Sequence, residues 1–232
     1  MRIGIVVPVW REEASSLSRA LDSVGKGSLP HELVVVGGEP DPKLQACTER
    51  FGGTWIISRK GRAEQQNSGV SHLSNECTHL LFLHADTRLP AHWREAMARC
   101  IRDGAALGAF SLTFDEPRLR WIQWGGRIRN KLQRTPYGDQ CLFMSRKTFE
   151  QLGGFRQLAL MEDLDLVWRS RKIGAISISS AQAQTSGRRY LATGPARLWV
   201  HHTILAILFQ LGWRPGLHST ALDDALLKLF KR

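Results

Sequence analysis

The first 90 residues alternate short apolar runs with segments of helical length, and this alternation constrains the fold more than any other feature. The apolar runs are Ile3–Val9, Glu32–Val36, Thr54–Ser58 and Leu80–Leu83. Segments with the length and composition of helices follow at about 14–24, 41–51 and 61–72. Strands that alternate with helices form right-handed βαβ units. We therefore expect an α/β protein, a Rossmann-like three-layer αβα arrangement with a mostly parallel central sheet.

Beyond residue 103 the alternation is looser, but it continues. Strands are predicted at 107–114 and 141–144, and helices at 119–132, at 149–152 and from 161 onward. We expect the two halves to share one continuous sheet. Gly25 and Gly27 should end the first helix, and an amphipathic helix is predicted at 222–230.

The charge and the cysteines restrict the class of protein. The chain of 232 residues has 32 Lys and Arg against 21 Asp and Glu, a net charge of +11. Such a charge attracts phosphates, nucleic acid or an anionic membrane surface. No nucleic-acid-binding motif is present and the arginines are dispersed, so we expect no nucleic-acid partner. The cysteines have no metal-site spacing and are expected to be buried free thiols in a reducing cytosol. They are Cys47, Cys77, Cys100 and Cys141.

No signal peptide or membrane span is predicted. The apolar run at Ile3 is short and meets Pro8 and charged residues at once. No stretch of about 18 apolar residues occurs. We expect a cytoplasmic protein.

The strongest candidate for a functional site follows the apolar run Leu80–Leu83, which breaks into His84, Ala85 and Asp86. Open α/β sheets bind their ligands outside the carboxyl ends of the strands. Mg²⁺ and Mn²⁺ are commonly shared between carboxylates and substrate phosphates. Asp86 is therefore a candidate for a metal–diphosphate site. The alternative is a turn or helix-capping aspartate ahead of Pro90.

Seven short motifs occur in a set order over residues 1–190. They are Val6–Glu13, Gly61–Asn67, Leu81–Thr87, Tyr137–Gln140, Leu152–Phe155, Met161–Asp163 and Thr185–Tyr190. In this order they resemble glycosyltransferase family 2 on the GT-A fold, and most closely its small bacterial subgroup associated with radical-SAM and selenodomain proteins. The resemblance implies transfer of a sugar from a nucleotide-diphosphate donor to an acceptor hydroxyl, with a divalent metal (Mg²⁺ or Mn²⁺) and inversion at the anomeric carbon. A UDP-sugar is the expected donor, with a GDP-sugar as the alternative.

The resemblance also implies roles for individual residues. Asp86 matches the metal-side aspartate of the family's DxD motif, and His84 stands where the first aspartate is usual. His84 is either a second metal ligand or a core or capping histidine. Asp163 matches the general base and Glu162 its support. The alternative is that both carboxylates only stabilise a helix N-terminus.

Donor and acceptor residues follow from the same resemblance. For the donor, they are Pro8, Trp10, Glu12, Glu39, Arg62, Gln66, Ala85, Asp86, Arg188 and Arg189; for the acceptor, Asp139 and Gln140. Glu39 or Asp41 would replace the aspartate that ends the second strand in relatives. Plain packing is the alternative for Trp10, and solvated surface for Gln66. Asp165 is expected to face solvent or a basic neighbour.

The expected organisation is one GT-A domain over residues 1–192, with a nucleotide-sugar-binding half at about 1–105 and an acceptor half at about 106–192. Residues 193–232 would form a helical extension. Its apolar part, 198–213, fits a membrane interface near a lipid-linked acceptor, or else a helix packed on the sheet or in a homodimer. His201 and His202 are expected to be packing or surface residues.

Three further points concern the activity. The processive signature Gln-x-x-Arg-Trp is absent, which favours transfer of a single sugar. A GT-A-like nucleotidyltransferase is one rival, although the loop Pro8–Glu13 has no Gly-rich phosphate-binding sequence. A non-catalytic basic module that binds nucleotide, RNA or lipid is the other rival.

Overall fold

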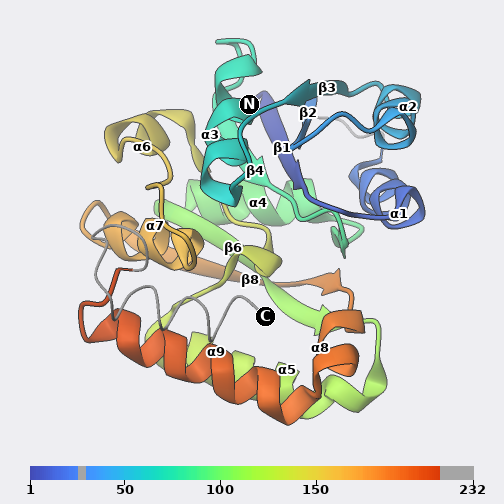
Figure 1. The fold of residues 1–232 in the computed structure, drawn as a ribbon. Helices are drawn as coiled ribbons and strands as arrows, with labels where there is room; N and C mark the ends of the chain where they lie inside the picture. Colours follow the sequence, from blue (N-terminus) through green and yellow to red (C-terminus); the bar gives the residue numbers. More distant parts are fainter. Residues whose placement is uncertain (26–29, 215–232) are drawn as a thin grey trace.

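The protein forms one continuous mixed sheet with helices on both faces (Figure 1). The structure is a computed structural model that describes residues 1–25 and 30–214. The predicted cap at Gly27 and the predicted helix at 222–230 lie outside the described residues.

The first half of the sheet is parallel. Strand β1 pairs with β2 on one side and with β4 on the other, and β2 pairs with β3. The bounds are β1 (Ile3–Val9), β2 (His31–Gly37), β3 (Thr54–Ile57) and β4 (His79–Phe82). These strands coincide with the apolar runs of the sequence. Strands β1, β2 and β4 are apolar because helices cover them on both faces, whereas β3, at the edge of the sheet, is partly exposed.

The second half continues the same sheet, in the order β3-β2-β1-β4-β7-β6-β8-β5. Strand β7 runs antiparallel to both β4 and β6, β8 runs parallel to β6, and β5 runs antiparallel to β8. The bounds are β5 (Thr87–Arg88), β6 (Ala105–Phe114), β7 (Phe143–Ser145) and β8 (Ala175–Thr185). The prediction of one sheet through both halves is confirmed.

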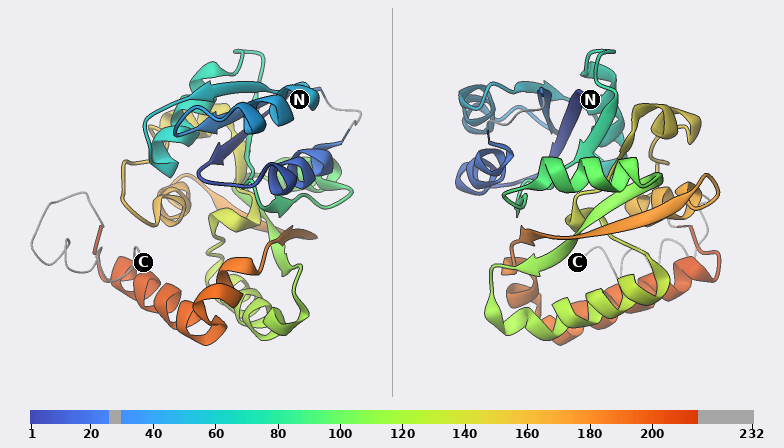
Figure 2. Two further views of the ribbon diagram at one scale, coloured as in Figure 1. Left: turned by 45° about the vertical axis from the view of Figure 1, so that its right-hand side comes forward. Right: turned by 180° about the vertical axis from the view of Figure 1, so that it is seen from behind.

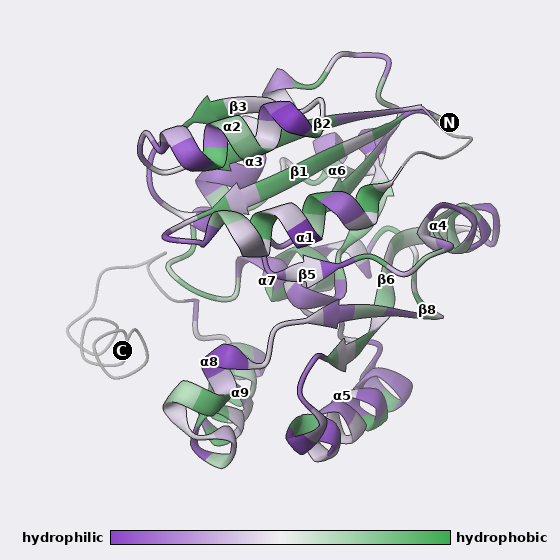
Figure 3. Ribbon diagram, turned by 90° about the vertical axis from the view of Figure 1, so that its right-hand side faces the viewer, coloured by the Kyte–Doolittle hydropathy of each residue, from purple (hydrophilic) through white to green (hydrophobic). Residues whose placement is uncertain are grey.

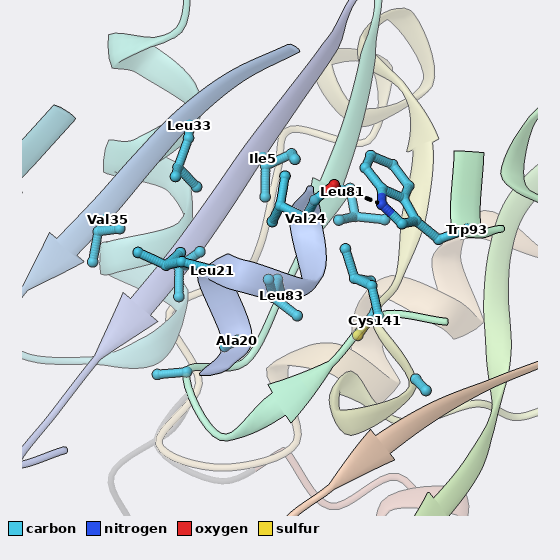
Figure 4. Close-up of a cluster of buried hydrophobic side chains, with 14 of the residues drawn as sticks. Ile5, Ala20, Leu21, Val24, Leu33, Val35, Leu81, Leu83, Trp93 and Cys141 are labelled. Atoms are coloured by element: carbon cyan, nitrogen blue, oxygen red, sulfur yellow. Dashed lines mark hydrogen bonds between the residues drawn. The ribbon is translucent and has the colours of Figure 1, made fainter. Parts of the chain in front are cut away.

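Two apolar cores lie on the two faces of the sheet. Side chains of β1 alternate between them, since Ile5 and Val7 lie in one core and Val6 in the other. Helices α1, α2 and α4 cover the first core, and α3, α6 and α7 cover the second. In the first core the indole nitrogen of Trp93 donates to the carbonyl of Val24 at 3.2 Å (Figure 4). The predicted three-layer αβα arrangement is confirmed.

Most helices fall at or near the segments predicted for them, but those at Trp93–Arg102 and Arg188–Thr193 were not predicted. Their bounds are α1 (Ala14–Val24), α2 (Pro42–Arg50), α3 (Arg62–His72), α4 (Trp93–Arg102), α5 (Arg120–Gln133), α6 (Arg146–Gln151), α7 (Glu162–Ser170), α8 (Arg188–Thr193) and α9 (Pro195–Gln210). Helices α5 and α9 lie along the end of the molecule opposite α2 and β3 (Figure 2). Within the residues described, no helix has the length and apolar content that crossing a membrane requires.

Three strands differ from the sequence-based prediction. The strand predicted at 141–144 begins at Phe143, because Cys141 takes a left-handed backbone conformation with φ of 52°. Strands β5 and β8 were not predicted at all. The four cysteines are buried and free, as expected.

Candidate active site

The loop after β4 carries the predicted metal residues at the carboxyl edge of the sheet. Ala85 is buried, while His84 and Asp86 on either side of it are partly exposed. The backbone carbonyl of Asp86 accepts from the N–H of Ser186, which joins this loop to the end of β8. A small pocket of about 30 Å³ lies beside the carboxylate. It is lined by Ser16, Arg19, Asp86, Arg88, Asp115, Gln184, Thr185 and Ser186.

The candidate base, Asp163, is separated from this loop in space by one residue, Gly138. The N–H of Gly138 donates to Asp163 Oδ2 at 2.6 Å. A Cβ atom built on Gly138 would lie 2.8 Å from His84 Nε2 and 3.1 Å from Asp163 Oδ2. The His84 ring and the Asp163 carboxylate therefore both lie close to Gly138. The fold thus brings the end of β4 and the start of α7 together.

Glu162 is buried beside Asp163 and has one cationic neighbour. Its Oε1 lies 3.7 Å from Arg62 Nε and, among the described residues, accepts no hydrogen bond. Burial raises the pKa of Glu162 to about 7, the charge of Asp163 acts in the same direction, and Arg62 opposes both. The role of this pair as base and support, and the alternative role at a helix N-terminus, both stay predictions.

The histidine and the aspartate of the β4 loop have opposite pKa shifts. Burial, assisted by Arg62, holds the pKa of His84 well below its usual value, so the ring is neutral at pH 7 and can act as a ligand. Burial raises the pKa of Asp86 and Glu12 adds to the effect, while Arg188 and Arg62 oppose it. In the described part of the chain no group of three or more His, Cys, Asp or Glu could hold a metal. A site of two protein ligands fits Mg²⁺ or Mn²⁺ when phosphate oxygens and water complete the coordination.

The loop before β7 contributes a second buried carboxylate. Asp139 lies in the short 3-10 turn η2 (Gly138–Gln140), and its Oδ1 is buried without a hydrogen-bond partner among the described residues. Burial raises the pKa of Asp139 to about 6. The charge of Arg129 opposes the shift, whereas Asp163 and Asp86 add to it. Asp139 is thus close enough to both carboxylates to respond to their charge.

Gln140 was predicted to bind the acceptor, but the protein itself uses its side-chain amide. The residue is fully buried, and its Nε2 donates to the carbonyl of Phe110 at 2.7 Å. Its Oε1 accepts from Asn130 Nδ2 at 3.1 Å and from the N–H of Tyr137 at 3.2 Å. In this arrangement Gln140 holds the turn, and of the two predicted acceptor residues only Asp139 has a free oxygen.

On the donor side, Trp10 packs rather than standing free. Its ring lies 3.9 Å from Lys60 Nζ, and a Cβ atom on Gly38 would meet it at 2.8 Å. Pro8 is partly buried near the end of β1, and Glu39 is exposed on the loop after β2. The replacement of the usual strand-end aspartate by Glu39 stays a prediction.

The two arginines of the predicted basic motif, Arg188 and Arg189, lie in different environments. Arg188 Nη2 donates to both carboxylate oxygens of Glu12, at 2.6 and 2.7 Å, and the pair acts electrostatically on Asp86. Arg189, the next residue, is exposed. This ion pair between Arg188 and Glu12 joins the loop after β1 to the start of α8. The Arg188 guanidinium lies near the loop that carries Asp86.

Two polar residues of the sequence analysis are buried. The alternative that Gln66 is solvated surface was wrong: it is buried, and its Nε2 lacks a partner among the described residues. Its spacing from Ala63 and Val70 already places it on the buried face of a helix. Asp165 is buried as well and pairs with Arg169 at 2.6 Å, so the expected basic neighbour is confirmed.

Two further amides were missed by the sequence analysis. Gln65 donates to the carbonyls of Val9 and Val36, at 2.7 and 2.8 Å. Asn67 exchanges hydrogen bonds with the backbone of Phe155. The run Gln65-Gln66-Asn67 after a glycine was the only signal for them. Hydropathy patterns cannot tell such buried amides from surface ones.

Comparison with known proteins gives a clear match only at the level of structure. No family model matches the sequence, and no curated protein matches it. The mannosyltransferase PcManGT from Pyrobaculum calidifontis, solved with GDP-Man and Mn²⁺, aligns with a TM-score of 0.57 at 18% identity, over 78% of this chain and 56% of that one. TarS 1-349 from S. aureus with UDP-GlcNAc gives 0.60 at 17% identity, over 80% of this chain and 58% of that one.

A second structure of TarS 1-349 gives a TM-score of 0.61 at 14% identity, over 100% of this chain and 71% of that one. This chain spans somewhat more than half the length of PcManGT and of the TarS complex with UDP-GlcNAc. At identities this low, the similarity shows the fold alone. The chain has the GT-A-type fold of these glycosyltransferases.

Proposed function

We propose that the protein is a metal-dependent, inverting glycosyltransferase of family 2, in the radical-SAM/selenodomain-associated subgroup. It would transfer a single sugar from a nucleotide-diphosphate sugar to an acceptor hydroxyl. The observation that carries this proposal is the approach of both His84 and Asp163 to Gly138. A candidate diphosphate loop and a candidate base thus share one edge of the sheet. The nucleotide sugars and Mn²⁺ named in the matching structures support it.

The donor diphosphate would be held at the loop after β4. Asp86 and neutral His84 are the residues that would hold the metal, which stabilises the negative charge developing on the leaving nucleoside diphosphate. Arg62 is half exposed and would face the same charge. A diphosphate bound here would compete with Glu12 for Arg188, because phosphate and carboxylate bind guanidinium in the same bidentate manner.

The acceptor side would be formed by the start of α7 and the turn before β7. Asp163 would take the proton from the attacking hydroxyl. N–H groups of Gly138 and Leu164 donate to its two oxygens, at 2.6 and 2.7 Å, and fix its orientation. Glu162 would support it, and Asp139 would contact the acceptor. Attack from the side opposite the diphosphate inverts the anomeric centre.

The nucleotide would lie at the ends of β1 and β2. Pro8, Trp10 and Glu39 line that region, and Trp10 already packs on the Gly38 backbone and Lys60. Among the described residues, no contact favours the base of UDP over that of GDP. The donor is therefore proposed to be a UDP-sugar or a GDP-sugar, and binding measurements can distinguish the two.

The first experiment measures thermal shifts with a panel of UDP-sugars and GDP-sugars, each with Mn²⁺, with Mg²⁺ and with chelator. A true donor raises Tm by mass action, and only when the metal is present. Release of the free nucleoside diphosphate should follow slowly without acceptor. If no nucleotide sugar raises Tm with either metal, the proposal fails, and metal-independent RNA binding would favour the rival basic module instead.

Two variants separate the two sides of the site. Asp86→Asn should abolish the metal-dependent part of the Tm shift. Asp163→Asn should keep that shift and lower the transfer rate by about 10²- to 10⁴-fold, the usual loss on removing a general base. Asp22→Asn, at an exposed aspartate of α1, is the matched control and should change neither. Wild-type transfer by Asp163→Asn would show that the base is a different residue.

A further inference from the structure

Helix α5 leaves a stripe of large apolar side chains uncovered. Trp121, Trp124, Ile128 and Leu132 are 45%, 66%, 38% and 77% exposed. Their spacing of three, four and four residues puts them on one face of the helix. Large aromatic and aliphatic side chains gathered in this way mark an interaction surface, whereas scattered ones need no explanation.

Helix α9 is apolar on much of its circumference, yet it buries only Leu198, Leu205 and Phe209 among the described residues. Five further apolar side chains of the helix and of the residue after it are exposed. They are Trp199, Val200, Ile204, Ile207 and Leu211. A helix with so much apolar surface is normally buried in protein or in lipid.

The two exposed stripes meet. The rings of Trp121 and Trp199 lie 5.8 Å apart between centroids, edge to face, and a Cβ atom on Gly125 would lie 3.7 Å from Trp199 Nε1. In both views of Figure 2, α5 and α9 run along the same end of the molecule. In Figure 3 they lie below β8. We call the exposed residues of α5, α9 and Leu211 the α5–α9 face.

The charge of this region is entirely positive. Segments 120–134 and 188–211 contain eight Arg and Lys residues and no Asp or Glu. Tryptophan side chains bordered by basic residues are typical of surfaces that lie in the headgroup region of an anionic bilayer. A second copy of this chain would bring the same positive charges against one another, which costs binding energy. The charge thus favours a lipid surface over a homodimer.

We propose that the α5–α9 face docks on the surface of an anionic lipid bilayer, with Trp121, Trp124 and Trp199 in the headgroup region. Docking would place the acceptor side of the site at the bilayer, because α9 also reaches inward. His202 Nδ1 lies 3.1 Å from the hydroxyl of Tyr190, and the charge of Asp163 acts on the His202 ring. A lipid-linked acceptor would then approach along α9. That last step rests on the proposed function, whereas docking itself does not.

The test is sedimentation of the full-length chain with vesicles of phosphatidylcholine alone, or of phosphatidylcholine mixed with phosphatidylglycerol. Binding is expected only to the mixed vesicles, and it should weaken as salt is added. Bromine-labelled lipids should quench tryptophan fluorescence in the bound protein. These readouts do not involve sugar transfer, so an inactive preparation can still support or overturn the proposal.

Substitutions of exposed residues test the face directly. The double variant Trp124→Ser, Ile207→Ser should weaken vesicle binding at least about ten-fold. Arg127→Gln combined with Lys131→Gln should weaken it by about 30-fold at low salt. Ile57→Ser is the matched control, since Ile57 is 52% exposed on β3, at the other end of the molecule, and should bind as the wild type does.

Three outcomes would overturn the proposal. One is no binding to anionic vesicles at low salt. Another is binding that the two double variants leave unchanged. The third is a dimer in solution that Trp124→Ser, Ile207→Ser dissociates, without any vesicle binding, which would assign the face to a second copy of the chain.

Discussion

Replacing Glu162 by glutamine should stabilise the protein at alkaline pH and not at acidic pH. The Glu162 side chain is buried at the start of α7, and its only ion pair is with Arg62, at 3.7 Å. Within the described residues its Oε1 accepts no hydrogen bond. Burial, with the charge of Asp163, raises the pKa of Glu162 from 4.5 to about 7 despite Arg62. The ionised form is therefore costly in the folded state.

The sign of the effect follows from proton linkage. Between about pH 4.5 and pH 7 the folded state keeps a proton on Glu162 that the unfolded state has released. The stability that this proton provides is complete below pH 4.5 and is lost as the pH rises through 7. The shift corresponds to at most about 3 kcal/mol. Glutamine has nearly the same shape and no charge, so the Glu162→Gln protein loses nothing over this range.

The measurement is urea unfolding of both proteins at several values between about pH 5 and about pH 8. The free energies of unfolding should agree at the acidic end, and the variant should be more stable by up to about 3 kcal/mol at the alkaline end. The control is Glu95→Gln on α4, where the glutamate is exposed. Curves for wild type and Glu162→Gln that stay parallel across the range would show that Glu162 is not held at a raised pKa.

Two other substitutions test the turn between the two carboxylate groups. Gly138→Ala places a methyl group 2.8 Å from His84 Nε2 and 3.1 Å from Asp163 Oδ2. It should therefore reduce both the metal-dependent Tm shift and transfer, the latter by about 10²-fold, with an unchanged circular dichroism spectrum. Gln140→Leu leaves the carbonyl of Phe110 and the N–H of Tyr137 without their partner, so urea unfolding should show a loss of about 2–3 kcal/mol. A loss of donor affinity in Gln140→Leu, at unchanged stability, would contradict its structural role.

The strands of the first half could be predicted because burial on both faces forces an apolar sequence. Strand β8 could not, since its sequence is AISISSAQAQT and several of its residues are partly or fully exposed. Small polar residues give neither a continuous apolar run nor a clear alternation. Its place in the sheet comes from parallel pairing with β6, a contact far apart in the sequence. Tertiary contacts of this kind are invisible to local patterns.

The position of His84 and Asp86 at the carboxyl edge of the sheet was predictable from topology, because parallel strands open their carboxyl ends on one edge. The detailed environment of each carboxylate was not. The sequence shows that Glu162 and Asp163 are adjacent, but not that Arg62 pairs with the first while backbone N–H groups hold the second. These differences arise from burial and from loop geometry, which depend on the whole fold.

The buried glutamines explain how loops can carry a site with fixed geometry. Carbonyl groups at strand ends and irregularities lack a ladder partner and must be satisfied in another way. The side-chain amide of Gln65 donates to the carbonyls of Val9 and Val36, so it joins the ends of β1 and β2, where the nucleotide is proposed to lie. The side-chain amide of Gln140 donates to the carbonyl of Phe110, next to the register shift in β6, and so fixes the turn that carries Asp139. Each proposed side of the site is therefore anchored to the sheet by a buried amide, and a loop anchored in this way can hold side chains nearly as rigidly as a strand does.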